Sequence, residues 1–196
     1  MDADSMRKDA DSVERVFVPA GQTLRIGLLS EADRDALVAL HEECLEVRYT
    51  KAFYDRLLTQ SATSGLHSVL AVGCWVETDV PGEDRLVGSL SCGLHPSDGC
   101  DFTPRLCKQH DQVCYVMTLA VTQSWRRRRV ASGLLAHAIA HAERLQCGAI
   151  YLNVISYNRR AMSFYERHGF RRLAFLREYY RIDGRPFDSL VFARFL

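Results

Sequence analysis

Four consecutive arginines, Arg126 to Arg129, stand between an apolar run and a segment with helical periodicity. The first N–H groups of a helix have no partner inside it, and the helix dipole places partial positive charge at the same end. The order of strand, basic turn and helix therefore predicts a site for a phosphate or pyrophosphate. Ala131, Ser132 and Gly133 are small enough to let such a ligand approach the backbone. Guanidinium groups beside them would add charge-assisted, often bidentate bonds.

The arginine run alone is also typical of a solvated basic loop, a nuclear-localisation signal or a nucleic-acid patch. The charge distribution helps to separate these interpretations. Residues 1–100 carry 9 Lys/Arg and 17 Asp/Glu, whereas residues 101–196 carry 16 and 7. A protein that coats nucleic acid usually has a basic excess over its whole domain. Because the excess here is confined to the half with the arginines, the sequence favours a local anion site and no nucleic-acid partner.

Cysteines and histidines raise the question of a metal site. The largest grouping is formed by Cys92, His95, Cys100, Cys107, His110 and Cys114. Its spacings match no common zinc finger or ribbon, and His137 with His141 has no evident third ligand. We therefore expect no metal. The seven cysteines are scattered and odd in number, which suits free thiols in a reducing compartment.

The apolar periodicity predicts an α/β domain with a mixed sheet. Strands are expected at 23–29, 66–76, 86–94, 113–121, 149–155, 170–181 and 187–195. The first helix follows a capping-box-like Ser30–Asp33, and the second follows Thr50. A third helix is expected over 132–145, and a fourth from its cap at Asn158 to His168.

The first twenty residues are polar and contain no apolar core, so they predict a flexible tail (1–20) ahead of a domain at 21–196. They do not have the pattern of a secretory signal. No apolar run approaches the roughly 18 residues of a membrane span. We therefore expect a cytoplasmic protein without a membrane span.

Two motifs resemble the GNAT acyltransferase superfamily. Its members bind acetyl-CoA with a turn written Q/R-x-x-G-x-G/A between a strand and a helix, and Arg126 to Ala131 occupies this turn with Arg129 at the first glycine. The segment 158-NRRAMSFYERHGF-170 is similar to the segment N-x-x-A-x-x-F-Y-x-x-x-G-F that closes over the pantetheine end of CoA. The resemblance spans roughly residues 23–195. It implies a GNAT fold, with about seven strands flanked by about four helices, and acetyl-CoA as co-substrate.

The same resemblance implies which residues contact acetyl-CoA. A backbone N–H around Leu119 would polarise the thioester carbonyl, and Tyr165 would lie near the CoA sulfur. The expected contacts are Leu119, Ala120, Val121, Arg126, Arg127, Arg128, Arg129, Val130, Ala131, Ser132, Gly133, Asn158 and Tyr165.

Several segments narrow the resemblance to protein N-terminal acetyltransferases of the NatE and NatF type. They are 115-YVMTLAV-121, 150-IYLNV-154, 179-YYRI-182 and 45-LEVRYTKAFY-54. This resemblance implies acetylation of the α-amino group of protein N-termini, with Met followed by an apolar residue as the expected start. It leaves room for an auxiliary or ribosome-associated subunit. The expected acceptor site comprises Leu45, Glu46, Val47, Tyr49, Met117, Tyr179 and Tyr180, with Leu45 and Glu46 in place of the usual Phe and Pro.

In the enzymes that the chain resembles, a tyrosine and a histidine on neighbouring strands hold the water that removes the amine proton. Tyr115 matches the tyrosine, but Asn153 stands at the histidine position. Asn can orient a water but cannot accept a proton near neutrality. The resemblance thus implies a water held by Tyr115 and Asn153, with Tyr165 as proton donor to the leaving thiolate.

Two other functions remain open at this point. A GNAT enzyme that acetylates lysine side chains or a small amine would share the CoA site and differ in its acceptor site. A non-catalytic acetyl-CoA-binding or scaffolding subunit is compatible with Arg129 and Asn153, the two departures from the family pattern.

Overall fold

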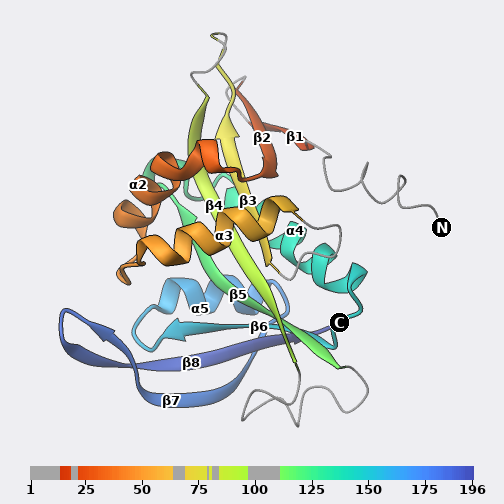
Figure 1. Cartoon of the computed structure of the whole chain (residues 1–196). Helices are drawn as coiled ribbons and strands as arrows, with labels where there is room; N and C mark the ends of the chain where they lie inside the picture. The colour runs from red at the N-terminus through yellow and green to blue at the C-terminus, as the bar shows by residue number, and fades with distance from the viewer. Residues whose placement is uncertain (1–13, 19–21, 64–68, 79, 81–83, 97–110) are drawn as a thin grey trace. The chain divides into compact units, whose positions relative to one another are not determined.

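The computed structural model describes residues 14–18, 22–63, 69–78, 80, 84–96 and 111–196. Within these ranges the chain forms eight strands and four α-helices (Figure 1). The hydrogen-bonded strand order is β1-β2-β3-β4-β5-β6-β8-β7. The prediction of an α/β domain with a mixed sheet is confirmed.

The chain divides into two compact units. One contains residues up to 91 together with 118–138, and the other contains residues 92–117 and 139–196. Strand β4 (Arg85–Pro96), strand β5 (Gln112–Val121) and helix α4 (Val130–Arg144) each contribute to both units. The units are described separately below.

The first unit begins with β1 (Glu14–Val18), which the sequence analysis missed. This strand pairs antiparallel with β2 (Gln22–Leu28), with Val16 opposite Leu24. The predicted flexible tail is therefore wrong for residues 14–18, because this short segment satisfies its backbone groups on the edge of β2. Residues 1–13 of that tail lie outside the described residues.

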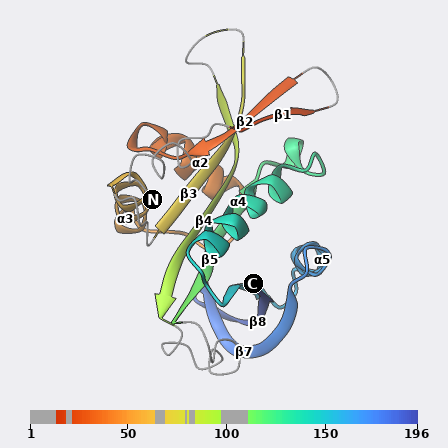
Figure 2. The same ribbon diagram turned by 90° about the vertical axis from the view of Figure 1, so that its right-hand side faces the viewer.

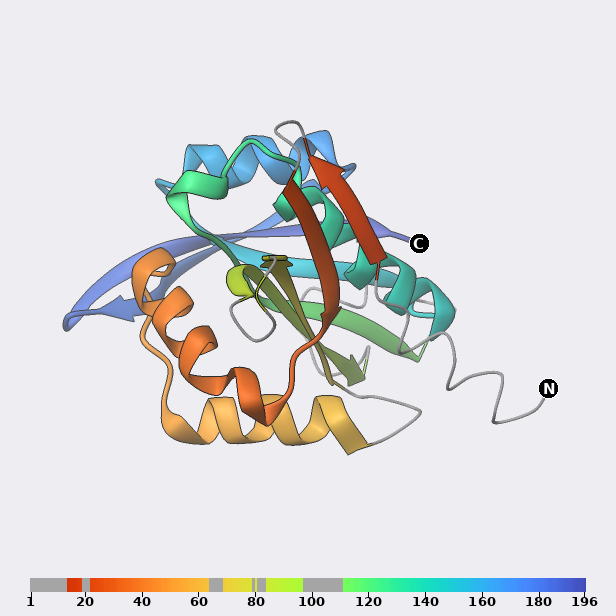
Figure 3. The ribbon, with the colours of Figure 1, turned by 90° about the horizontal axis from the view of Figure 1, so that it is seen from above.

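Two helices cover one face of the strands in the first unit. A single 3-10 turn (Glu31–Asp33) leads into α2 (Arg34–Cys44), and α3 (Lys51–Thr63) follows. Figure 3 shows the two helices beside β2 and β3 (Val69–Val76), and Figure 2 shows α4 on the opposite face. The buried residues on the apolar stripes of α2 and α3 include Leu37, Leu40, Leu57 and Leu58.

The second unit is built on β6 (Ala149–Ile155). It pairs parallel with β5, with Tyr115 opposite Tyr151, and antiparallel with β8 (Arg185–Phe195). Strand β7 (Arg171–Ile182) completes a hairpin with β8, and its turn has positive φ at Asp183 and Gly184 as a tight hairpin requires.

Local capping signals position α5 (Arg159–Arg167) between β6 and β7. The Asn158 side chain accepts a hydrogen bond from the backbone N–H of Ala161 at 3.0 Å, and Gly169 ends the segment with φ +84°. Both features were predicted, because a capping side chain and a left-handed glycine act within a few residues of the chain.

Candidate active site

Three tyrosines of the second unit converge on Asn153. The Asn153 Nδ2 atom donates to the hydroxyl oxygen of Tyr179 at 2.7 Å and to that of Tyr115 at 3.3 Å. The Tyr180 hydroxyl donates to the Asn153 backbone carbonyl at 3.1 Å. The structure thus brings together four residues that the sequence analysis assigned to catalysis or to the acceptor site.

A β-bulge explains how the consecutive residues Tyr179 and Tyr180 both reach Asn153. Side chains on a regular strand alternate between faces, but the β7–β8 register shifts between Leu176 and Tyr180, and Glu178 has φ +51°. The Glu178 N–H donates to an Asp188 carboxylate oxygen at 2.9 Å, which holds the bulge in place.

The environment of Tyr115 keeps its hydroxyl protonated. Burial, followed by repulsion from Tyr179, raises the pKa of Tyr115 far above its ordinary value, while the Asn153 donor opposes this shift. Tyr115 is therefore neutral at physiological pH, and it can donate its hydroxyl hydrogen but cannot serve as the base itself.

The Asn153 side chain has one unused polar atom. Its Oδ1 is buried and has no hydrogen-bond partner among the described residues. A buried carbonyl oxygen without a partner is costly, so this atom is open to an N–H or a water that enters the cluster.

Two further rings lie against Tyr115, and the expected site did not include Tyr151. The ring centroid of Tyr151 is 4.9 Å from that of Tyr115, and the exposed His95 lies edge-on at 5.8 Å. The register between β5 and β6 would have revealed Tyr151, since it pairs directly with Tyr115. Along β5, Met117 and Leu119 share the partial exposure of Tyr115, whereas Val116, Thr118 and Ala120 are buried.

The arginine turn belongs to the first unit, and its four side chains have different surroundings. The Arg126 Nε donates to the Val121 carbonyl at 3.1 Å, and the Arg128 guanidinium lies 4.7 Å from the Trp125 ring centroid. The guanidinium groups of Arg127 and Arg129 have no hydrogen bond or ion pair with any described residue. The guanidinium groups of Arg127 and Arg129 can therefore bind an anion without first breaking a contact with another described residue.

The backbone of this turn has the shape that a glycine would provide. Arg129, at the first glycine position of the family turn, has φ +64°, and Arg127 has φ +62°. A non-glycine residue in this left-handed region costs about 1–2 kcal/mol. The first i to i−4 bond of the helix runs from the Gly133 N–H to the Arg129 carbonyl at 3.0 Å, so the backbone N–H groups before Gly133 precede the helical bonding pattern.

Two glycines allow close packing around the start of α4. A Cβ on Gly88 would meet a Val130 methyl at 2.8 Å, and a Cβ on Gly133 would meet Ile26 at 3.0 Å. The small size of Gly133 thus serves its packing on Ile26 of β2, and its contact with a ligand stays a prediction.

The expected acceptor loop, residues 45–50, lies between α2 and α3 of the first unit. Leu45, Val47 and Tyr49 are partly buried, whereas Glu46 and the other even-numbered residues are exposed. The backbone bends at Glu46 and Val47, and the exposure of Glu46 distinguishes it from the three apolar residues. The Tyr49 ring stacks on Phe53 with a centroid distance of 4.3 Å.

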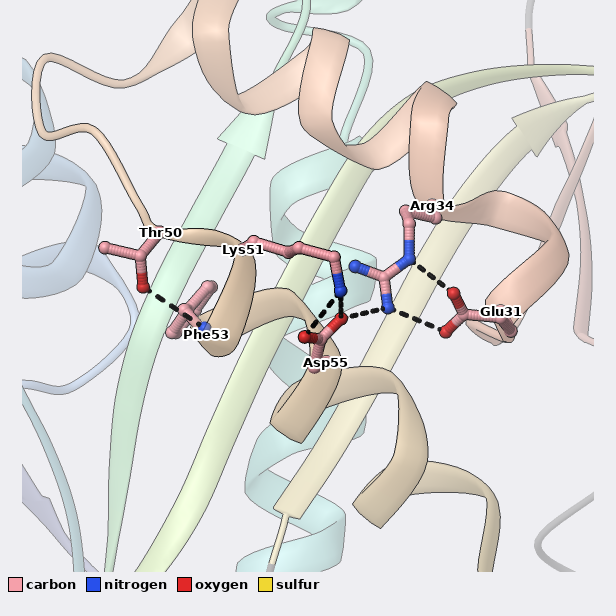
Figure 4. A network of polar contacts seen from close by, with 6 residues as sticks. All are labelled: Glu31, Arg34, Thr50, Lys51, Phe53 and Asp55. Atoms are coloured by element: carbon pink, nitrogen blue, oxygen red, sulfur yellow. Dashed lines mark hydrogen bonds and ion pairs between the residues drawn. The ribbon is translucent and has the colours of Figure 1, made fainter.

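Polar contacts fix the helices on either side of this loop (Figure 4). Arg34 pairs with Glu31 and, at 2.8 Å, with Asp55, which also pairs with Lys51 at 2.9 Å. The Thr50 hydroxyl accepts from the Phe53 N–H at 3.4 Å, which confirms Thr50 as the cap of the second helix. The two helices are thereby joined at their N-terminal ends.

The remaining predicted CoA contacts lie in the second unit. Tyr165 is buried beside Phe170, with ring centroids 5.5 Å apart, and burial raises the pKa of its hydroxyl well above the ordinary value. Tyr165 therefore carries a proton throughout the physiological range. The Asn158 side chain is engaged as the cap of α5.

The cysteines and histidines that raised the question of a metal site lie partly on the described strands. Cys92 and Cys114 are buried on strands, and Cys100, Cys107 and His110 lie outside the described residues. Among the residues that are described, no group of three His, Cys, Asp or Glu side chains could hold a metal ion. None of the described helices is both long and apolar enough to cross a membrane.

The parallel β5–β6 pair, the basic turn into α4 and the terminal β7–β8 hairpin define a GNAT-type acyltransferase fold. Residues 34–170 match the acetyltransferase (GNAT) family, and the chain belongs to this family. It is accordingly an N-acetyltransferase with acetyl-CoA as co-substrate. The available cations of Arg127 and Arg129 beside a helix N-terminus fit the phosphates of that co-substrate.

Curated relatives cover most of the chain. The chain is 25% identical to the histone acetyltransferase MCC1 of Arabidopsis thaliana over 96% of its own length and 76% of that protein. It is 24% identical to N-alpha-acetyltransferase 60 of Danio rerio over 88% of its length and 70% of the relative.

Solved structures share the fold. Arabidopsis thaliana NAA60 in complex with a bisubstrate analogue superimposes with a TM-score of 0.79 at 21% identity, covering 88% of this chain and 97% of that one. Arabidopsis thaliana Naa50 in complex with the bisubstrate analogue CoA-Ac-MVNAL gives a TM-score of 0.67 at 22% identity, covering 88% and 99%.

Proposed function

We propose that this protein transfers the acetyl group of acetyl-CoA to the α-amino group of protein N-termini that begin with Met and an apolar residue, in the cytoplasm. The observation that carries the proposal is the Asn153 cluster. Burial keeps the Tyr115 hydroxyl protonated, and the Asn153 amide cannot accept a proton near neutrality, so neither residue serves as the base. The acceptor amine would then arrive neutral or lose its proton to a water. An α-amino group has a pKa of about 8 and a lysine side chain about 10.4, so the α-amine is neutral far more often at pH 7.

The residues of the cluster support distinct roles in this reaction. Tyr115 would hold a water through its hydroxyl, and the unpartnered Asn153 Oδ1 would accept a hydrogen bond from that water or from the amine. Tyr165 would donate a hydrogen bond to the leaving thiolate, because burial keeps its hydroxyl protonated, and the proton released by the amine would pass to water and neutralise the thiolate. Acetyl-CoA supplies an already reactive thioester, so positioning of the amine provides much of the acceleration.

The loop at 45–50 supports an apolar acceptor. Leu45, Val47 and Tyr49 are the partly buried apolar residues of the loop, and an apolar lining of this kind would suit an apolar side chain at the second position of the substrate. The names of the relatives N-alpha-acetyltransferase 60 and Naa50 support N-termini as the acceptor. A solved NatC complex with Gag peptide and CoA shares the fold at a TM-score of 0.70, and the proposal extends to an auxiliary or ribosome-associated subunit as a partner.

A panel of short peptides tests this function. Peptides that begin Met-Leu and Met-Ala should have the highest kcat/KM with acetyl-CoA, and peptides that begin Met-Lys or Met-Asp should be poorer. Equal rates across the panel would refute the specificity, and a higher kcat/KM for spermidine would refute the N-terminal acceptor.

A second candidate is acetylation of lysine side chains, which the name of the relative histone acetyltransferase MCC1 favours. The CoA site would be unchanged in that case. The discriminating substrate is an N-terminally blocked peptide with one lysine, which this second function predicts to be the better acceptor.

A further inference from the structure

A buried histidine lies beneath the acceptor loop and has no part in the reaction described above. His41, in the last turn of α2, is 2% exposed. Its Nε2 lies 3.1 Å from the Ser89 hydroxyl oxygen on β4, and its Nδ1 lies 3.3 Å from the Tyr54 hydroxyl oxygen on α3. One imidazole therefore connects α2, α3 and the sheet of the first unit.

The same ring is adjacent to the acceptor loop. Its centroid lies 5.9 Å from that of Tyr49, which in turn stacks on Phe53. The His41 carbonyl accepts the backbone N–H of Leu45 at 2.9 Å, at the point where the helix ends and the loop begins. The histidine thus contacts Leu45 and Tyr49, the first and the last of the three partly buried apolar residues of the loop.

The buried surroundings of His41 favour a neutral imidazole. A neutral ring donates from one nitrogen and accepts at the other, and a hydroxyl can take either role, so both bonds form without a buried charge. Burial lowers the pKa of His41 to about 4, so the ring is uncharged when the enzyme works near neutrality. An apolar residue would fill this space at a smaller desolvation cost, whereas two directed bonds fix one arrangement of the surrounding elements.

We propose that His41 is a positioning residue that holds the acceptor loop in the conformation that binds the substrate N-terminus. The proposal rests on the proposed function, because that function assigns the loop to the acceptor. It predicts that the loss of His41 weakens acceptor binding and leaves both the chemical step and acetyl-CoA binding unchanged.

The experiment compares variants of the full chain by steady-state kinetics with a Met-Leu peptide and by calorimetry with acetyl-CoA. His41→Leu should raise the KM for the peptide about tenfold, while kcat and the Kd of acetyl-CoA stay within about twofold. His41→Gln, which keeps one donor and one acceptor, should restore part of the loss. A general packing defect would not give this split or this rescue.

Single-bond variants keep the test decisive if His41→Leu does not fold. Ser89→Ala and Tyr54→Phe each remove one bond to the imidazole, and each should raise KM by a smaller factor. Ser91→Ala is the matched control, because it removes a buried hydroxyl two residues further along β4 that bonds Thr118 at 2.6 Å. It should leave KM unchanged.

An unchanged KM in the folded His41→Leu variant, or in both single-bond variants, would overturn the proposal, and so would an equal rise in Ser91→Ala. The wild-type enzyme is also assayed with an N-terminally blocked lysine peptide. A preference for that peptide refutes the N-terminal function, whereas the ratio of variant to wild-type KM on the preferred peptide still tests the role of His41.

Discussion

The four arginines of the arginine turn, Arg126 to Arg129, should contribute unequally to acetyl-CoA binding. The guanidinium groups of Arg127 and Arg129 have no partner among the described residues, whereas Arg126 is bonded to the Val121 carbonyl and Arg128 lies on Trp125. The informative comparison is between two double variants, Arg127→Gln with Arg129→Gln and Arg126→Gln with Arg128→Gln. Both remove two positive charges from the same turn. Glutamine also tolerates a positive φ no better than arginine, so the backbone strain is unchanged.

The expected magnitudes follow from these surroundings. A charge-assisted bond to a phosphate at an exposed site contributes about 1.4 kcal/mol, so the loss of two such bonds from Arg127 and Arg129 should weaken binding about 100-fold. The other pair should weaken binding less than about threefold, through the long-range charge alone. It should instead lower stability by about 1–2 kcal/mol, because it loses a hydrogen bond and a cation–π contact.

Calorimetry with acetyl-CoA at low and high salt, together with thermal denaturation, measures both effects. The affinity loss in the Arg127 and Arg129 variant should shrink at high salt, since ions screen exposed charges. An equal or larger loss of affinity in the Arg126 and Arg128 variant would refute the assignment.

Three further predictions concern catalysis and stability. Tyr115→Phe should lower kcat about 100-fold without changing the Kd of acetyl-CoA, while the control Tyr151→Phe retains activity. Full activity in Tyr115→Phe would show that no water held by Tyr115 takes part in the reaction. Arg129→Gly should raise the melting temperature by about 2–4 °C, because glycine adopts the positive φ of this position without strain. Arg129→Val should lower the melting temperature, and the reverse order of the two variants would contradict a strained backbone at Arg129. The pKa of His41 is about 4 in the folded chain, below the ordinary 6.5, so between these pH values the unfolded chain binds more protons. The free energy of unfolding should therefore fall by on the order of 3 kcal/mol as the pH drops from 6.5 to 4. Denaturation at both pH values should show a loss that is larger in the wild type than in His41→Gln by this amount.

Features that depend on local chemistry could be predicted from the sequence. Asn158 caps α5 and Gly169 ends it, because both act on backbone groups a few residues away. The strand containing Tyr115 was evident from its apolar run. The positive φ of Arg129 agrees with the glycine that the family turn carries at that position.

Features that depend on pairing between distant segments could not be predicted in this way. The bulge at Glu178 arises from the register of β7 on β8, and it brings both Tyr179 and Tyr180 to Asn153. The contact of His41 with Ser89 joins residues 48 positions apart. Strand β1 was missed because five residues followed closely by Pro19 give a weak pattern, which only pairing with β2 stabilises.

The acceptor is tested most directly by one peptide that carries both kinds of amine. The peptide begins Met-Leu with a free α-amino group and contains a single internal lysine. After incubation with the enzyme and acetyl-CoA, tandem mass spectrometry locates the acetyl group. The proposed function predicts that it is found on the N-terminal amine, and the Tyr115→Phe variant should give little product on either amine. Acetylation mainly on the lysine would contradict the assignment of this protein to N-terminal acetylation.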